Sequence, residues 1–176
     1  MTGNQLYSTL HGIVEAERLQ PIVSKHRNPG LIYIPPGTWE GSLIVAQHNL
    51  TLVGAGDETV IVGERGEPAI TVNAPNVRIL NLSVRTEYAY PAISFTDGDA
   101  PQGIIQNVKV LESGAYGVFR DGDYSSPINA IIDCHFENVA GSAICAESGA
   151  GPQNLIQGNT GESIGDEFIK WGVNAS

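Results

Sequence analysis

The sequence predicts an all-β chain that folds as a right-handed parallel β-helix of about five to six coils, with an N-terminal capping α-helix. The first observation is a 26-residue period between Asn or Asp residues, at Asn81, Asn107, Asp133 and Asn159. The second is an apolar residue that recurs at nearly the same step, at Ile70, Ile93, Val118, Ile144 and Ile169. A period between about 20 and 50 residues is typical of a solenoid, in which each repeat buries its apolar face against its neighbours.

Each repeat contains two short strands around a corner. The three clearest copies are residues 77–84, 103–110 and 129–136, and in each an Asn or Asp stands between the two strands. Asn and Asp tolerate a left-handed backbone better than other non-glycine residues, so stacked coils would align these corner residues in a ladder. A third strand is expected at residues 69–72, 92–95, 117–119, 143–145 and 168–171. Three strands per coil are the arrangement of a parallel β-helix.

Alternation within the strands separates an inner face from an outer face. The predicted inner residues are Val77, Ile79, Leu82, Val84, Ile105, Val108, Val110, Ile131, Cys134 and Phe136. The predicted outer residues are Arg78, Ser83, Lys109 and His135. A β-sandwich of short strands is the alternative fold, but it would not need this constant register between repeats.

The segment before the repeats has the spacing of an amphipathic helix. Apolar residues occur at i, i+4, i+7 and i+8 within residues 4–20, at Leu6, Leu10, Ile13 and Val14. Pro21 would stop this helix. An open β-helix end exposes strand edges, so we expect the helix to cap it. Residues 1–30 would then form the capping helix and a linker, and residues 31–176 the parallel β-helix.

The charge balance limits the partners. The 176-residue chain has a formal net charge of −10, which argues against nucleic acid because phosphate binding needs clustered Lys and Arg. The sequence predicts no membrane span and no secretory signal, while an extracellular or virion-surface location stays open. The two cysteines, Cys134 and Cys145, fall on strand positions expected to face the core, so we expect buried thiols.

The first coils resemble a known group of β-helix proteins. Residues 31–45 read Leu-Ile-Tyr-Ile-Pro-Pro-Gly-Thr-Trp-Glu-Gly-Ser-Leu-Ile-Val, and residues 49–63 read Asn-Leu-Thr-Leu-Val-Gly-Ala-Gly-Asp-Glu-Thr-Val-Ile-Val-Gly. Together they resemble the opening of the pectin lyase-like superfamily, especially pectin methylesterases and their non-enzymatic relatives. The resemblance implies the fold and no single reaction, because the same opening begins enzymes, surface repeats and phage tail proteins.

Catalytic motifs of this superfamily are present only in part. Thr96-Asp97-Gly98 resembles the Asn-Thr-Asp-Gly signature of polygalacturonases, but Phe95 stands where they have Asn. Residues 167–169 resemble the nucleophile segment of pectin methylesterases, with Glu167 in place of its Asp. The resemblance therefore implies a carbohydrate-facing module that binds polysaccharide without a complete known catalytic set. The alternatives are a polysaccharide hydrolase, lyase or esterase, and a structural domain of a tail spike or surface assembly.

Two Asp-Gly-Asp turns, which begin at Asp97 and Asp121, each come directly after a third strand. Their separation is about one coil, which would bring their carboxylates together along one edge, with Glu147 after the next copy. Three interpretations stay open. The first is that these are ordinary turns. The second is a calcium site at Asp99, Asp123 and Glu147. The third is acid–base catalysis on a glycosidic bond by Asp97, Asp121 and Asp123 with Arg120. Calcium is the one cofactor that the sequence suggests.

A polar column is expected on the outer face, because Ser83, Lys109 and His135 follow one another at the 26-residue period of the corners. Lys109 and His135 are candidate substrate-binding residues, together with Tyr116 and Tyr124 from the loops. The polar groups would bond sugar hydroxyls, and the aromatic rings would stack on sugar rings. An ordinary solvated face is the alternative.

Self-association is also expected. Outward apolar residues recur at the same step, at Ile104, Ala130 and Ile156. The coil that ends near Trp171 has no counterpart of the N-terminal cap. A column of exposed apolar side chains is a typical contact surface, so the expected partners are a glycan and further copies of this chain in a homo-oligomer.

Overall fold

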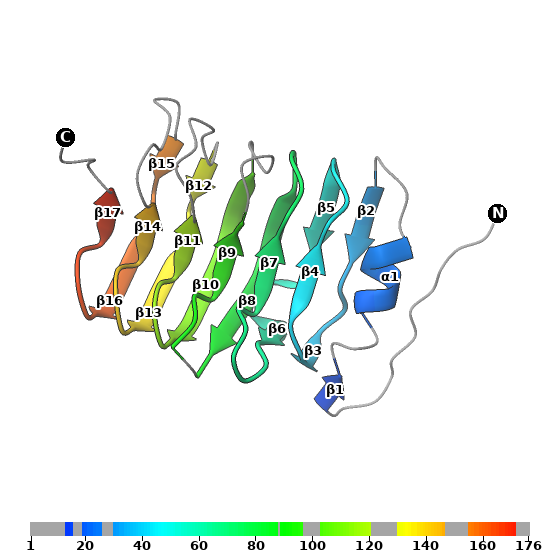
Figure 1. The fold of residues 1–176 in the computed structure, drawn as a ribbon, viewed down its shortest axis with the longest axis horizontal. Helices are drawn as coiled ribbons and strands as arrows, with labels where there is room; N and C mark the ends of the chain where they lie inside the picture. Colours follow the sequence, from blue (N-terminus) through cyan, green and yellow to red (C-terminus); the bar gives the residue numbers. More distant parts are fainter. Residues whose placement is uncertain are drawn as a thin grey trace.

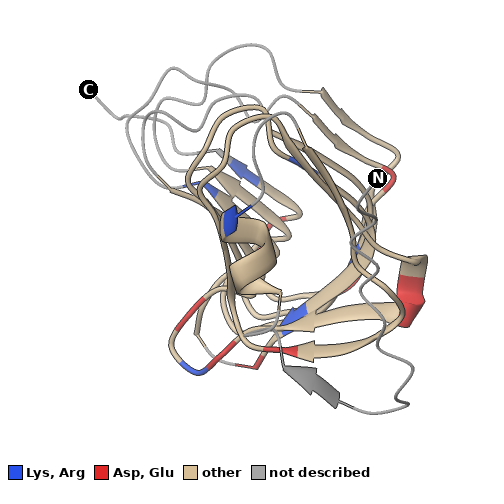
Figure 2. Ribbon diagram, turned by 90° about the vertical axis from the view of Figure 1, so that its right-hand side faces the viewer, with Lys and Arg blue, Asp and Glu red and all other residues tan. Residues whose placement is uncertain are grey.

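The computed structural model describes residues 13–15, 19–25, 30–87, 89–96, 103–120, 130–146 and 155–171. Within these ranges the chain is a right-handed, all-β parallel solenoid with one short α-helix near the N-terminus. Its turns are stacked along one axis (Figure 1), and a view along that axis shows them superimposed into a single tube (Figure 2). The predicted fold class is confirmed.

Three groups of strands make up the turns. The first group is β2 (Gly30–Tyr33), β5 (Leu50–Val53), β8 (Arg78–Thr86), β10 (Ile104–Ser113), β12 (Ala130–Ile132) and β15 (Leu155–Gln157). The second adds β3 (Gly37–Glu40), β6 (Thr59–Val62), β13 (His135–Val139) and β16 (Thr160–Ile164), and the long β8 and β10 span both groups. The third is β4 (Leu43–Val45), β7 (Ile70–Val72), β9 (Ile93–Phe95), β11 (Val118–Arg120), β14 (Ile144–Ala146) and β17 (Ile169–Trp171). The first two groups belong to one sheet, and the third group forms a six-stranded sheet.

About four turns have a neighbouring turn on both sides, and this count of inner turns differs slightly from the five to six coils that the sequence predicts in total. The first turn, from β2 to β4, has a neighbouring turn on one side. Its other side is covered by β1 (Ile13–Glu15), which pairs with β3, and by α1 (Gln20–Lys25), which packs against β4. The last turn, from β15 to β17, pairs with the turn of β12 to β14.

The predicted register of the third strands is confirmed. Leu43 pairs with Ile70, and the same column continues through Ile93, Val118, Ile144 and Ile169. The corners follow the prediction as well, since Asn81, Asn107 and Asp133 have left-handed φ values of 53, 52 and 52°. The side-chain amide Nδ2 of Asn107 donates to Oδ1 of Asn81 at 2.9 Å, which is one step of the expected ladder.

The fourth predicted corner residue, Asn159, does not continue this column. His135 pairs with Thr160, so the last step is one position shorter than the period and Asn159 lies beside Cys134. Gly158 takes the left-handed position instead, with a φ of 69°. Asn159 still joins the two turns through its side chain, which accepts from the Cys134 N–H at 2.9 Å and donates to the Ile131 carbonyl at 2.8 Å.

The interior of the tube is the hydrophobic core. All ten predicted inner residues, from Val77 to Phe136, are buried. Trp39 fills the first turn, where its indole N–H donates to the Pro35 carbonyl at 3.1 Å. Phe136 and Phe168 close the other end of the described core, with ring centroids 5.9 Å apart and planes at 88°. Such edge-to-face pairs are a preferred aromatic arrangement.

Two predictions for the outer face are wrong in detail. Ser83 lies in the outer column but is buried, because the 3-10 turn η2 (Gly56–Glu58) packs against β8. Cys134 and Cys145 are both buried, as predicted, and Cys145 pairs with Phe119 and Lys170 in the third group. Ile156 pairs with the core residue Ile131, so Leu155 continues the column of Ile104 and Ala130.

The N-terminal cap is built differently from the predicted helix over residues 4–20. Residues 13–15 form β1, because the β-branched Ile13 and Val14 suit a strand and the edge of β3 offers it a partner. The remaining predicted helical residues up to 18 lie outside the described ranges. The helix α1 begins at Gln20, and Pro21 stands in its first turn, where a missing N–H costs no hydrogen bond.

Two side chains attach α1 to the edge of β4 and to the segment that follows β4. The Gln20 amide accepts from the Ile44 N–H at 2.7 Å and donates to the Ile44 carbonyl at 3.0 Å, as a neighbouring strand would. Gln47 donates to the Ser24 carbonyl at 3.2 Å. Leu19 and Val23 are fully buried below these contacts. Among the described helices, none has the length and apolar character needed to cross a membrane.

Candidate functional site

A polar column runs along the outer face of the large sheet. Ser83 on β8 pairs with Lys109 on β10, Lys109 pairs with His135 on β13, and His135 pairs with Thr160 on β16. In parallel strands such partners stand about 4.8 Å apart on the same face. The predicted Ser83, Lys109 and His135 column is therefore present, and Thr160 extends it by one turn.

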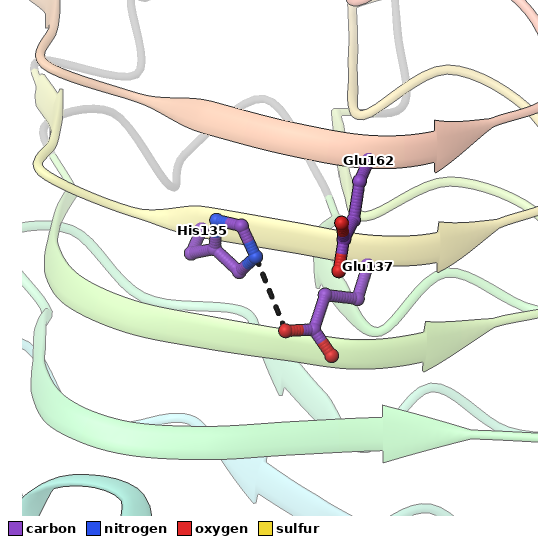
Figure 3. Close-up of side chains that lie close together, drawn as sticks. All are labelled: His135, Glu137 and Glu162. Atoms are coloured by element: carbon purple, nitrogen blue, oxygen red, sulfur yellow. Dashed lines mark ion pairs between the residues drawn. The ribbon is translucent and has the colours of Figure 1, made fainter.

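Glu137 joins two members of this column. Lys109 Nζ lies 2.6 Å from Glu137 Oε1, and His135 Nε2 lies 3.1 Å from the same oxygen. The hydrogen bond with Lys109 holds the pKa of Glu137 below its usual range, and the same bond raises the pKa of Lys109. Figure 3 shows the imidazole and the Glu137 carboxylate turned toward each other. An ion pair of this kind fixes the positions of both charged groups.

The neighbouring turn adds two further groups. Thr160 Oγ1 lies 2.8 Å from His135 Nδ1, so the hydroxyl holds the imidazole from the side opposite Glu137. Glu162 pairs with Glu137 in the strand register. The ligand atoms of His135, Glu137 and Glu162 all lie within 4.8 Å of one another, and Figure 3 shows that they come from two adjacent strands. These three residues have the donor atoms to hold a metal ion.

A groove of about 230 Å³ lies beside the column. The corner residues Asn107 and Asp133 form part of its wall, because their left-handed backbone is where the two strands of a turn meet. Lys109 and His135 form another part, and Asp57 from η2 contributes a carboxylate. The negative charge of Asp57 also favours the charged form of Lys109 and so contributes to its raised pKa. The groove is thus lined mainly by hydrogen-bonding groups.

The other predicted site residues lie elsewhere. Tyr116 is in the turn between β10 and β11, where its ring stacks on Phe119 with centroids 5.0 Å apart. Arg120 is buried at the end of β11, between Phe95 and Ala146 of the adjacent turns, and burial lowers its pKa. The remaining predicted residues are outside the described ranges and stay predictions: Asp97, Asp99, Asp121, Asp123, Tyr124 and Glu147.

Four contributors to the site were missed from the sequence: Glu137, Thr160, Glu162 and Asp57. Glu137 lies two positions after His135 on the same strand, where strand alternation could have found it. Thr160 and Glu162 follow His135 and Glu137 one position earlier than the strict 26-residue period requires, so a search at that period passes over them. A one-residue tolerance in the last step would have found both. Asp57 belongs to η2, a turn inserted between β5 and β6, and no repeat in the sequence signals its position.

Comparisons with known proteins agree with the fold. No protein-family model matches the chain, and no curated protein matches it. A solved structure of a pectin methylesterase from Yersinia enterocolitica is similar, with a TM-score of 0.61 and 19% sequence identity. The similarity covers 76% of this chain and 51% of that one, so the chain spans about half the length of that structure. At this identity the likeness concerns the fold.

Proposed function

We propose that this chain, which has the pectin lyase-like β-helix fold, is a carbohydrate-facing module that binds a polysaccharide along its flank. The observation that carries the proposal is the column of Lys109, His135 and Thr160 beside a groove lined by Asn107 and Asp133. A glycan chain needs donors and acceptors repeated along an extended surface. The stacked turns repeat such groups about every 4.8 Å.

The groove offers both kinds of hydrogen-bonding group to sugar hydroxyls. The Lys109 ammonium donates, the Asp133 carboxylate accepts, and the Asn107 amide does both. These side chains are held by the strand register rather than by a long loop, which lowers the entropy lost on binding. The fold thereby supports a preformed, polar binding surface.

Charge narrows the class of glycan. The groove contains two carboxylates, from Asp57 and Asp133, and one ammonium, from Lys109. The chain as a whole has a formal net charge of −10. Because like charges slow and weaken association, a neutral polysaccharide suits this surface better than one made of uronic acids.

Binding without turnover is proposed because the catalytic motifs of the superfamily are incomplete in this sequence. Phe95 replaces the Asn of one signature, and Glu167 replaces the Asp of another. In the structure the Lys109 ammonium and the Glu137 carboxylate form an ion pair with each other. A polysaccharide-processing enzyme and a structural domain are the alternatives that an experiment must separate.

A glycan array with neutral and acidic polysaccharides tests the proposal, run with a chelator and combined with assays for reducing sugars and unsaturated products. We expect binding to a neutral glycan and no product. Lys109→Ala and His135→Ala should each weaken binding by about tenfold or more, since hydrogen bonds to charged groups are worth about 1.5–3 kcal/mol. Lys170→Ala and His48→Ala remove the same side-chain types elsewhere and should bind as the unmodified chain does.

The other outcomes overturn the proposal in different ways. Product formation would favour an enzyme. Absence of both glycan binding and product would favour a structural domain. Equal binding by Lys109→Ala, His135→Ala and the unmodified chain would show that a glycan binds at another surface. Melting curves of the four variants confirm that each comparison is made between folded proteins.

A further inference from the structure

We infer that His135, Glu137 and Glu162 form a binding site for a first-row divalent transition metal, with zinc as the best match. This site goes beyond glycan binding, because it needs no sugar and can be tested with the metal alone. Its three donors are one imidazole nitrogen and two carboxylate oxygens, which are ordinary zinc ligands. They come from adjacent strands, β13 and β16.

The distances allow the three donors to meet at one ion. Their ligand atoms lie within 4.8 Å of one another, whereas ligands about 2.1 Å from a tetrahedral zinc ion stand about 3.4 Å apart. Side-chain rotation can close this gap. The Glu137 side chain is 21% exposed and that of His135 is 36% exposed, so both have room to move and the ion can enter from solvent.

The imidazole is oriented as a metal ligand requires. Zinc-binding histidines commonly bond through one ring nitrogen and hold the other in a hydrogen bond to the protein. Here Nδ1 is 2.8 Å from Thr160 Oγ1, and Nε2 faces the Glu137 carboxylate. A hydrogen bond from Nδ1–H to the hydroxyl leaves the lone pair of Nε2 directed at the carboxylates, where a cation would lie between them.

The charges on the two strands also favour a cation. Glu137 and Glu162 are directly paired in the register, and like charges at paired positions destabilise a sheet. Lys109 offsets part of this repulsion through its contact with Glu137. A divalent ion would contact both carboxylates at once, and it would compete with the Lys109 ammonium for Glu137.

The nitrogen donor decides the class of metal. Calcium and magnesium prefer oxygen ligands, while imidazole suits zinc, copper, nickel and cobalt. Three protein ligands leave a fourth position for water, as in zinc sites that stay open to solvent. The predicted calcium site at Asp99, Asp123 and Glu147 is a different place in the chain and a different chemistry.

Titration of the metal-free chain with zinc, followed by calorimetry, tests the inference. Cobalt serves as a coloured substitute, because its visible spectrum distinguishes four- or five-coordinate from six-coordinate sites. We expect one equivalent of zinc and a strong visible cobalt spectrum. His135→Ala and Glu162→Gln should each weaken zinc binding about 100-fold or abolish it. The controls His48→Ala and Asp166→Asn alter a histidine and a carboxylate outside the site, and they should leave the affinity for zinc unchanged.

Two further variants keep the inference testable if a ligand variant folds poorly. Thr160→Val leaves all three ligands in place and should weaken zinc binding about 10- to 100-fold, as loss of a supporting hydrogen bond does. Lys109→Met removes the ammonium that competes for Glu137, so it should tighten zinc binding by up to about fivefold. Absence of zinc binding, or binding that survives in both His135→Ala and Glu162→Gln, would overturn the site.

Discussion

The side-chain amide of Asn107 donates a 2.9 Å hydrogen bond to Oδ1 of Asn81, one turn earlier in the solenoid. Both residues have a left-handed backbone, with φ values of 52 and 53°. The bond therefore joins two corners that other residues would occupy only at a cost. Lys109 and Ser83 each follow these corners by two residues and pair with each other in the strand register.

Asn107→Val should lower the free energy of unfolding by about 2–3 kcal/mol. The left-handed backbone costs a non-glycine residue about 1–2 kcal/mol, and the lost hydrogen bond adds about 1 kcal/mol. Guanidinium denaturation measures the change. Gln106→Val is the control, because Gln106 is exposed on the same strand and its backbone is not left-handed. Equal effects of the two substitutions would contradict a special role for the corner.

Gln20→Ala should loosen the N-terminal end of the solenoid. The substitution removes both hydrogen bonds to Ile44 and leaves the edge of β4 without this partner. We expect a loss of about 1–3 kcal/mol and faster hydrogen exchange of the Ile44 amide. Gln20→Glu keeps the acceptor but sets a carboxylate against the Ile44 carbonyl, so it should also destabilise. Unchanged exchange at Ile44 in both variants would show that the edge is protected by something else.

Cys134 should make stability fall at high pH. Burial raises the pKa of its thiol to about 11 from an ordinary value of 9.0. A group whose pKa is raised on folding contributes its full stability below the unfolded pKa and loses it as the pH rises toward the folded pKa. Between pH 9 and pH 11 the loss should reach about 2–3 kcal/mol.

The difference between the unmodified chain and Cys134→Ala isolates this effect from other groups that titrate in the same range. The variant starts less stable, because it leaves space in the core, but it should lose less stability between pH 9 and pH 11. Parallel pH profiles for the two proteins would contradict the assignment.

Self-association stays a prediction, with a corrected surface. The outer apolar column contains Ile104, Ala130 and Leu155, and Leu155 is 49% exposed. Arg78 precedes Ile104 in the same column and limits its apolar length. We expect light scattering to show a mass that rises with concentration and falls in Leu155→Asp. A mass that stays at the monomer value at high concentration would contradict this prediction.

The periodic part of the molecule could be predicted because one rule governs every turn. Inward apolar residues such as Ile105 and Ile131 must meet in register, so a constant step in the sequence becomes a column in space. The Ser83, Lys109 and His135 column follows from the same step. Its existence was therefore predictable, although its binding role is a proposal.

The departures from the period could not be predicted in this way. The last turn is one position shorter than the period because Gly158 can occupy the left-handed corner in place of Asn159. The η2 turn is an insertion, so neither the burial of Ser83 nor the position of Asp57 follows from the repeat. The helix at Gln20 depends on contacts with β4, which local sequence preference does not contain.

The most direct test of glycan binding at this flank is a chemical-shift titration of the ¹⁵N-labelled chain with the neutral glycan that the array selects. The account predicts saturable shifts at the amides of Asn107, Lys109, Asp133 and His135. Residues on the outer side of the six-stranded sheet, such as Ser94 and Phe119, should stay unchanged. Shifts confined to that sheet, or no shifts along the Lys109 and His135 column at saturation, would contradict the account.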